Sequence, residues 1–430
     1  MSCVLAIDCS TTAAKVVAFE STGRVIATAR ARLNRSSPHP GWGEQTAESW
    51  WVATRTALLD ITKQLAALGE EAPQALCITH QRETFVCLDD QGTEVRPGIL
   101  WLDTRAHEQI ARYGSAEVHR ISGKPPGTTP SLYKILWMKE NEPEEFARTA
   151  MVLDVGGYLV YRLTGEFATS TASADPLSMM DMASFTWSDE LISLAGLSPA
   201  QLPRLVPPGS EIASVSAEAA LATGLPVGMP VIAGAGDGQS AGLGAAVVSA
   251  GNAYLSLGTS IVIGVHSNEY GTAQAYRTLS SPIAGAYTLE ALIAAGALSI
   301  SWFREKIAEL PDSSTADAAL GELASTAPLG SRGLLFLPYL TSAETPYWDA
   351  AARGAFVGLG DYHGHADMIR AVYEGLAMEI RLLVEAIELD TGVPITTLTA
   401  MGGASQSSVF LQIITNVVKR HITVAAETET

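Results

Sequence analysis

Cysteine is scarce in this 430-residue chain, and its placement excludes the sites that cysteine usually builds. The four cysteines, Cys3, Cys9, Cys77 and Cys87, form no CxxC pair and have no metal-ligand spacing. Disulfides are rare in reducing compartments. We therefore expect reduced, partly buried thiols in a cytoplasmic protein.

Basic residues are also in the minority, with 27 Lys and Arg against 45 Asp and Glu, and the net charge is −18. This balance argues against nucleic acid or an anionic membrane as a partner. No membrane-spanning segment is predicted, because that would need ~20 consecutive, predominantly apolar residues. Asp8 interrupts the only early apolar run, so no signal peptide is predicted. The chain contains no Walker sequence, which makes a P-loop kinase a poor hypothesis.

Apolar residues make up 47% of the chain, and 38 residues are glycine, as in a globular α/β protein. The length exceeds that of most single cores, so we expect two domains. We place the boundary near residues 245–251, which gives domains of residues 1–246 and 247–430.

Periodicity predicts three early strands and two long helices. The strands are residues 4–8, 14–19 and 25–33, and the helices are residues 48–68 and 367–391. The second helix is predicted to start with Asp367 as its N-cap and to end before Gly392. Residues 205–225 are rich in Pro, Gly and Ala and are interpreted as connecting structure.

Two predicted hairpins have hydroxyl-rich turns, one following Asp8 and one formed by Gly258, Thr259 and Ser260. Phosphoryl transfer needs groups that cradle the phosphates, a metal-binding carboxylate and a base. In the first hairpin, Asp8 could hold Mg²⁺ through water. The other candidates there are Thr11 and Thr12 as donors and Lys15 as a point charge. The alternatives are a turn-capping aspartate and a surface lysine, and the repeated turn favours the functional interpretation.

Asp237 lies in the glycine-rich loop predicted after the buried strand at residues 231–234. Asp237 is the candidate base, and the glycines of the loop would let a substrate approach the backbone. The alternative is an aspartate that only forms a turn. A dinucleotide fingerprint is not met, because the GxGxxG spacing is absent.

Arg82 and Glu83 lie between two strand-like runs and offer donors beside an acceptor, which suits a sugar or polyol. The alternative is a surface ion pair of little energetic value. Trp101 could pack on the carbon face of a sugar or belong to the core, and the sequence leaves both open.

The motifs together resemble the FGGY family of carbohydrate kinases along essentially the whole chain. The most specific piece is GAFVGL from Gly354, followed after seven residues by DMIRAVYE from Asp367. Residues 130–141, with Lys134 and Trp137, are similar to the family's N-terminal signature, and residues 40–45 (PGWGEQ) also resemble the family.

The resemblance implies two actin-like, ribonuclease H-like domains with ATP–Mg²⁺ and sugar in a cleft. The N-terminal domain would carry the sugar and metal side, and the C-terminal domain the nucleotide side. By resemblance, Asp237 is the catalytic base, Arg82, Glu83 and Trp101 contact the substrate, and Asp8 serves Mg²⁺. The residues expected to bind phosphate or nucleotide are Thr11, Thr12, Lys15, Gly258, Thr259, Gly296, Gly402 and Gly403.

Several positions depart from the family pattern. Ser10 replaces the usual glycine of the first turn, so a different backbone is expected there. Arg82-Glu83 resembles glycerol and tetritol kinases, whereas residues 100–105 (LWLDTR) are closer to xylulokinases. Gly238 falls where glycerol kinases have glutamine and xylulokinases asparagine.

The family also continues beyond the position of Thr430, so we expect a C-terminally incomplete domain with part of its nucleotide wall missing.

The sequence therefore predicts an ATP-dependent kinase that phosphorylates a terminal hydroxyl of a ketopentose, xylulose-type first, with glycerol or a tetritol as the alternative. Rivals of another class are an actin- or chaperone-like ATPase and a non-catalytic sugar-binding regulator. The expected partner is a small sugar or polyol. The choice between a monomer and a homodimer stays open.

Overall fold

The computed structural model describes residues 3–349 and 351–425, so residues 427–430, the end of the expected incomplete domain, lie outside it. The chain forms two compact units. Unit 1 comprises Met1–Ser240 and Leu279–Tyr287, and unit 2 comprises Ala241–Thr278 and Thr288–Thr430. Residues Leu279–Tyr287 thus pack with a unit that is distant in sequence. The Tyr287 hydroxyl donates to the carbonyl of Met182, and its ring stacks on Phe185.

Unit 1 is built on a six-stranded sheet in the order β13-β14-β5-β1-β2-β3. Its antiparallel meander is β1 (Cys3–Cys9), β2 (Ala13–Glu20) and β3 (Val25–Arg32). Both β5 (Leu76–His80) and β14 (Pro230–Gly236) run parallel to β1, and β13 (Glu211–Ser214) closes the edge. The three predicted early strands are confirmed.

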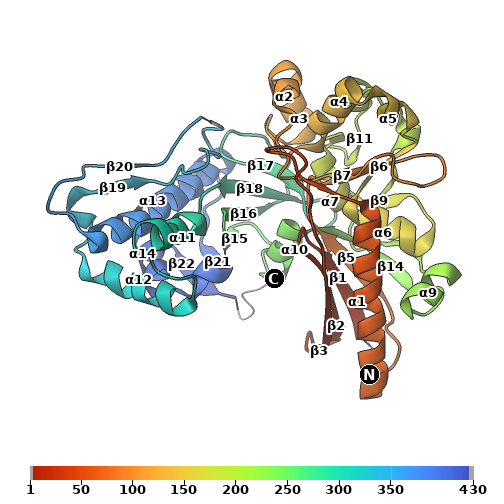
Figure 1. The fold of residues 1–430 in the computed structure, drawn as a ribbon, viewed down its shortest axis with the longest axis horizontal. Coiled ribbons are helices and arrows are strands. Elements are labelled where there is room, and N and C mark those ends of the chain that lie inside the picture. The colour runs from red at the N-terminus through yellow and green to blue at the C-terminus, as the bar shows by residue number, and fades with distance from the viewer. Residues whose placement is uncertain (1–2, 350, 426–430) are drawn as a thin grey trace. The chain divides into compact units, whose positions relative to one another are not determined.

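Helix α1 (Ala47–Leu68) packs on β2 and β3 of this sheet (Figure 1). Side chains alternate across a strand. Leu5 and Ile7 of β1 therefore face the core shared with Leu58 and Ile61 of α1, and Asp8 lies on the opposite face. Thr46 caps the N-terminus of α1, and Gly69, in the left-handed conformation, ends it.

A second layer of unit 1 holds a four-stranded sheet in the order β4-β7-β6-β8. Its strands are β4 (Glu44–Gln45), β7 (Gly98–Ile99), β6 (Phe85–Leu88) and β8 (Met151–Asp154). The helices of this region include α2 (His107–Tyr113), α3 (Ala116–Ser122), α4 (Ser131–Asn141), α5 (Pro143–Arg148) and α6 (Val155–Thr164). A separate core joins Phe85 and Ile99 to Leu132 and Leu136 of α4.

Unit 2 is also built on a six-stranded sheet, in the order β17-β18-β16-β15-β21-β22. Strands β15 (Asn252–Leu257) and β16 (Ile261–Ser267) are antiparallel, and β21 (Thr397–Met401) and β22 (His421–Val424) continue in parallel with β15. The others are β17 (Arg277–Ser280) and β18 (Tyr287–Ile293). In each sheet, two parallel strands extend an antiparallel pair, β1–β2 or β15–β16, which agrees with the predicted α/β fold of two ribonuclease H-like domains.

The helices of unit 2 are α11 (Ala297–Lys306), α12 (Ser314–Thr326), α13 (His365–Thr391) and α14 (Ser408–Val418). The predicted helix at 367–391 is present, and Gly392 ends it in the left-handed conformation. Asp367 as its N-cap is wrong, because the helix starts two residues earlier. The Asp367 carboxylate instead accepts the N–H of Gly364, one of the donors that a helix N-terminus leaves unpaired.

The interpretation of residues 205–225 as connecting structure is also wrong. The segment contains β13, the edge strand of the main sheet, and α9 (Ala217–Thr223), capped by Ser216 and Gly224. Its Pro, Gly and Ala content conceals short elements whose partners lie elsewhere in the chain. None of the helices among the described residues combines the length and apolar character needed to cross a membrane.

Arg105 locks the segment that follows β7 onto its surroundings. Its guanidinium bonds both oxygens of Asp103 at 2.9 and 2.6 Å and Glu44 at 2.8 Å. The guanidinium carbon lies 3.6 Å from the ring centre of Trp42 and 4.8 Å from that of Trp137. Because the group is planar and buried, it stacks and forms a bidentate pair at once.

We predict that Arg105→Lys lowers the free energy of unfolding by about 2 kcal/mol or more, since an ammonium cannot supply the bidentate pair and the stacking together. Urea unfolding followed by tryptophan fluorescence measures this. The matched control is Arg24→Lys, at an exposed arginine paired with Glu20, where little change is expected. Equal midpoints for the two variants would contradict the assigned role of Arg105.

Candidate active site

Three adjacent parallel strands of unit 1 bring candidate residues from distant parts of the sequence to one sheet edge. Asp8 of β1 pairs in register with Thr79 of β5, and His80 of β5 pairs with Gly236 of β14. The carboxyl ends of parallel strands meet at the same edge, where open α/β sheets bind their ligands. Asp8, Arg82 and Asp237 therefore gather there.

Asp237 begins helix α10 (Asp237–Gly244) directly after β14 ends at Gly236. The predicted glycine-rich loop is thus wrong, because strand passes straight into helix. The N–H of Gly238 donates to Asp237 Oδ1 at 2.8 Å, and Nε of Arg82 lies 3.2 Å from the same oxygen. The Asp237 side chain is 49% exposed. Desolvation raises its pKa, and the Arg82 guanidinium opposes that shift. A fixed but accessible carboxylate of this kind can accept a proton.

The glycines around Asp237 make room for Arg82. A Cβ at Gly236 would lie 2.4 Å from Arg82 Cγ, and a Cβ at Gly238 would lie 2.6 Å from Arg82 Nη2. The immediate reason for glycine is therefore the arginine, whereas the sequence suggested close approach of a substrate to the backbone. At Gly234 the requirement for glycine is different, because a Cβ there would collide with the backbone carbonyl of Ile78.

Arg82 and Glu83 do not form the exposed pair considered as an alternative. The side chain of Arg82 is 10% exposed, and Glu83 is 6% exposed. Glu83 also has φ +53°, in the left-handed region that residues other than glycine rarely adopt. Such strain persists where the surroundings enforce it, often at functional sites.

Trp101 is 41% exposed, which excludes the alternative that it belongs to the core. Its indole N–H donates to Thr11 Oγ1 at 3.0 Å. The fully buried ammonium of Lys134 fixes this segment, donating to the carbonyls of Leu100, Trp101 and Thr129 at 3.0, 3.0 and 3.1 Å. Burial lowers the pKa of Lys134 to about 7, although Glu83 and Asp103 counteract the shift. In the sequence, Lys134 stood out only as part of the segment similar to the family's N-terminal signature. The structure shows that its ammonium binds three backbone carbonyls.

Asp8 heads a row of charges across the meander, paired in register with Lys15, which is paired with Arg30. Desolvation, with a smaller contribution from Asp237, raises the pKa of Asp8 to about 6, and the cations of the row counteract it. Asp8 Oδ1 is buried without a hydrogen-bond partner. The sequence did not identify Arg30 as a member of this row, and only the register between the strands could have indicated it.

An unpaired carboxylate oxygen fits Mg²⁺, which commonly takes one or two protein carboxylates and completes its shell with water and phosphate. In residues 3–349 and 351–425, no three His, Cys, Asp or Glu side chains gather as metal ligands. Asp8 is therefore a suitable ligand for such a cation, directly or through water.

The first turn keeps an ordinary backbone despite Ser10. Ser10 is not among the described residues with positive φ, and its hydroxyl bonds the carbonyl and N–H of Ala13. The serine therefore closes the turn with its own side chain. Thr11 and Thr12 follow at its tip, Thr12 being exposed.

The residues predicted to bind nucleotide lie around the β15–β16 turn of unit 2. The N–H groups of Ala297 and Leu298, at the start of α11, donate to the carbonyls of Gly258 and Thr259. A Cβ at Gly296 would lie 2.5 Å from the backbone nitrogen of Ile261. A Cβ at Gly402, where φ is +86°, would lie 2.9 Å from the carbonyl group of Leu257. The structure thus brings Gly258, Thr259, Gly296 and Gly402 together, and Gly403 follows in open space.

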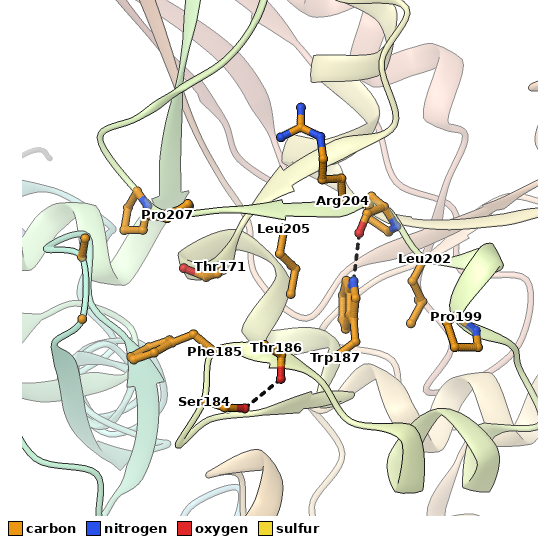
Figure 2. A pocket seen from close by; sticks show the side chains of 14 residues that line it. Thr171, Ser184, Phe185, Thr186, Trp187, Pro199, Leu202, Arg204, Leu205 and Pro207 are labelled. Carbon is orange, nitrogen blue, oxygen red and sulfur yellow. Dashed lines mark hydrogen bonds between the residues drawn. The ribbon is translucent and has the colours of Figure 1, made fainter.

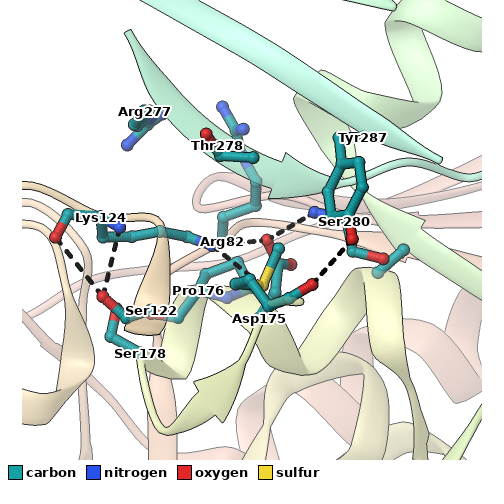
Figure 3. A network of polar contacts seen from close by, with 12 residues as sticks. Arg82, Ser122, Lys124, Asp175, Pro176, Ser178, Arg277, Thr278, Ser280 and Tyr287 are labelled. Atoms are coloured by element: carbon teal, nitrogen blue, oxygen red, sulfur yellow. Dashed lines mark hydrogen bonds and ion pairs between the residues drawn. The ribbon is translucent and has the colours of Figure 1, made fainter. Parts of the chain in front are cut away.

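A buried polar network behind Arg82 had no sequence signal. Lys124 Nζ lies 2.8 Å from Asp175 Oδ2, which also accepts the N–H of Ser280 at 3.0 Å (Figure 3). Gln239 joins Asp175 Oδ1 at 3.3 Å to Arg82 Nη1 at 3.5 Å. Removing one member would leave buried charges unpaired, so the network holds Arg82 from behind.

A cavity of about 850 Å³ in unit 1 is lined by none of the predicted site residues. Phe185, Trp187, Leu205 and several prolines line it (Figure 2). The indole of Trp187 points to the carbonyl of Pro203, with a hydrogen bond of 2.8 Å.

Comparison with known proteins gives matches over nearly the full chain. Residues 3–244 match the N-terminal domain and residues 253–430 the C-terminal domain of the FGGY family of carbohydrate kinases. The xylulose kinase of Escherichia coli (strain K12) is 32% identical over 96% of this chain and 84% of its own. The glycerol kinase of Chloroflexus aggregans is 28% identical over 95% and 83%. The crystal structure of xylulose kinase from Rhodospirillum rubrum superposes with a TM-score of 0.93 at 29% identity, covering 98% of this chain and 86% of that one.

We predict that Gly238→Ala lowers kcat/KM by about 10- to 100-fold with little change in Tm, because the new methyl group displaces the Arg82 guanidinium from Asp237. The displaced atoms end a flexible side chain, so folding tolerates the change. The control is Gly244→Ala in the same helix, where a Cβ meets nothing within 4 Å. If both variants retain full activity, the position of Arg82 is unimportant.

Proposed function

Because the chain belongs to the FGGY family of carbohydrate kinases, which are phosphotransferases with an alcohol acceptor, we propose that it transfers the γ-phosphate of ATP to a terminal hydroxyl of a ketopentose, xylulose-type first. The resemblance to xylulose kinases supports this acceptor. The Arg82–Glu83 pair favours a second candidate, glycerol or a tetritol, because it matches the pattern of polyol kinases. We further propose a cytoplasmic enzyme.

The observation that carries the proposal is the half-exposed Asp237 carboxylate held against Arg82. Asp237 takes the proton of the acceptor hydroxyl while the hydroxyl oxygen attacks the γ-phosphorus of ATP. ADP then leaves with the electrons of the broken P–O bond. Arg82 keeps the carboxylate directed at the hydroxyl. The face of Trp101 and the buried Glu83 complete the acceptor side.

The phosphate side would use both hairpins. In unit 1, the proposed phosphate contacts come from Thr11, Thr12 and Lys15. In unit 2, the proposed nucleotide contacts come from Gly258, Thr259, Gly296, Gly402 and Gly403. Asp8 would hold Mg²⁺ through water, and the ion would supply charge neutralisation for the phosphates. Lys15 adds a fixed positive charge beside Asp8.

We expect one acceptor to stand far above background when ADP release from ATP–Mg²⁺ is measured across a panel of D-xylulose, L-xylulose, D-ribulose, erythritol, L-erythrulose, glycerol and gluconate. A pentulose at the top supports the first proposal, and glycerol or erythritol supports the second. Turnover independent of acceptor would instead indicate an ATPase. Acceptor binding without turnover would indicate a regulator.

We predict that Asp237→Asn lowers kcat by about 10²- to 10⁴-fold while acceptor binding persists, because the amide keeps the shape but cannot take the proton. Rapid-quench kinetics and calorimetric titration with the best acceptor measure the two effects. Asp189→Asn, at the exposed first residue of helix α8 (Asp189–Ala195), is the control and should leave both unchanged. Near-normal turnover in Asp237→Asn would remove the carboxylate from the base role.

A further inference from the structure

Four residues of unit 1 close a ring of hydrogen bonds between the acceptor side and the first phosphate turn. We call Thr11, Gln81, Thr84 and Trp101 the Gln81 ring. The hydroxyls of Thr11 and Thr84 both donate to Gln81 Oε1, at 2.9 and 3.4 Å. Both hydroxyls accept from Trp101, Thr11 from the indole N–H at 3.0 Å and Thr84 from the backbone N–H at 3.1 Å.

The ring occupies the hydroxyl hydrogens of both threonines and both N–H groups of Trp101. A threonine hydroxyl has a single hydrogen, and in both threonines it goes to Gln81. Thr11 therefore keeps its backbone N–H, not its hydroxyl, for a phosphate oxygen. The indole of Trp101 has one N–H, and Thr11 takes it. Rotation of the indole would break the bond that orients the phosphate turn.

Buried neighbours hold the ring in place. Gln81 and Thr84 are 2% and 1% exposed. Gln81 Nε2 donates to Gln45 Oε1 at 3.1 Å, and Gln45 Nε2 donates to the carbonyl of Thr11 at 2.8 Å. The indole of Trp50 fixes Gln45 at 2.9 Å. Since buried polar groups are costly to leave unpaired, the ring members have little freedom to move separately.

We propose that Gln81 and Thr84 are positioning residues that couple the acceptor contact at Trp101 to the phosphate contact at Thr11. This proposal rests on the function proposed above. An acceptor packed on the half-exposed indole orders it, and the ring passes that order to the turn that meets the phosphates. By linkage, acceptor and nucleotide each raise the affinity for the other by the same factor.

Trp101→Phe and Thr11→Val test the ring from its two ends. Phenylalanine keeps an aromatic face without the N–H, and valine keeps the shape of threonine without the hydroxyl. Calorimetry gives the Kd of AMP-PNP–Mg²⁺ with and without saturating D-xylulose, or the best acceptor of the panel. We expect a ratio of about 5 or more in the wild type. Each variant should bring the ratio close to one, and the double variant should lower it no further.

The control is Trp187→Phe. It removes the indole hydrogen bond to the carbonyl of Pro203, which is of similar length and does not belong to the Gln81 ring (Figure 2). It tests whether loss of any indole bond suffices, and its ratio should stay at the wild-type value. Gln81→Leu is a second probe. It removes the oxygen that accepts from both threonine hydroxyls, so it should lose the coupling.

The outcomes separate the two proposals. A wild type that phosphorylates no acceptor overturns the proposed function and the coupling with it. An active wild type with no affinity ratio overturns the coupling alone. Single variants that keep the ratio, or a double variant whose effect is the product of the two, also overturn it. A parallel fall in Trp187→Phe would reduce the ring to a structural role.

Discussion

The ion pair between Arg82 and Asp237 is the interaction on which the rest of the site depends. It forms because β5 and β14 are adjacent and parallel, so that the residues following their ends meet. Glycines at 236 and 238 leave the volume that the arginine occupies. Lys124, Asp175 and Gln239 support the guanidinium from the interior. An accessible carboxylate with a fixed cation beside it follows from backbone register and small residues.

The acceptor side is held by a second set of contacts that shares no side chain with the first. The buried ammonium of Lys134 donates to three backbone carbonyls, and the Arg105 guanidinium contacts the rings of both Trp42 and Trp137. These two cations fix the segment that carries Trp101 from opposite ends. Trp101 also belongs to the Gln81 ring, so one sugar candidate, Trp101, and one phosphate candidate, Thr11, are joined by hydrogen bonds.

The row of charges that starts at Asp8 shows how one strand can serve two roles within two residues. Ile7 faces the core against α1, and Asp8, one residue later, faces the opposite side beside Lys15. Alternation along the strand therefore gives β1 a hydrophobic face for stability and a charged face for chemistry. The second glycine- and threonine-bearing turn joins the corresponding antiparallel pair of unit 2, β15–β16, whose first strand likewise has a parallel neighbour.

The sequence by itself determined the features that depend on neighbours along the chain. Apolar alternation specified β1, β2 and β3, a continuous apolar stripe specified α13, and two hydroxyl-rich turns marked the hairpins. Only the tertiary structure decided how Arg82 reaches Asp237, why Gly238 must be small and how Gln81 joins Trp101 to Thr11. It also decided that Leu279–Tyr287 packs with unit 1. These contacts join residues tens to more than a hundred positions apart, and local periodicity carries no information about such pairs.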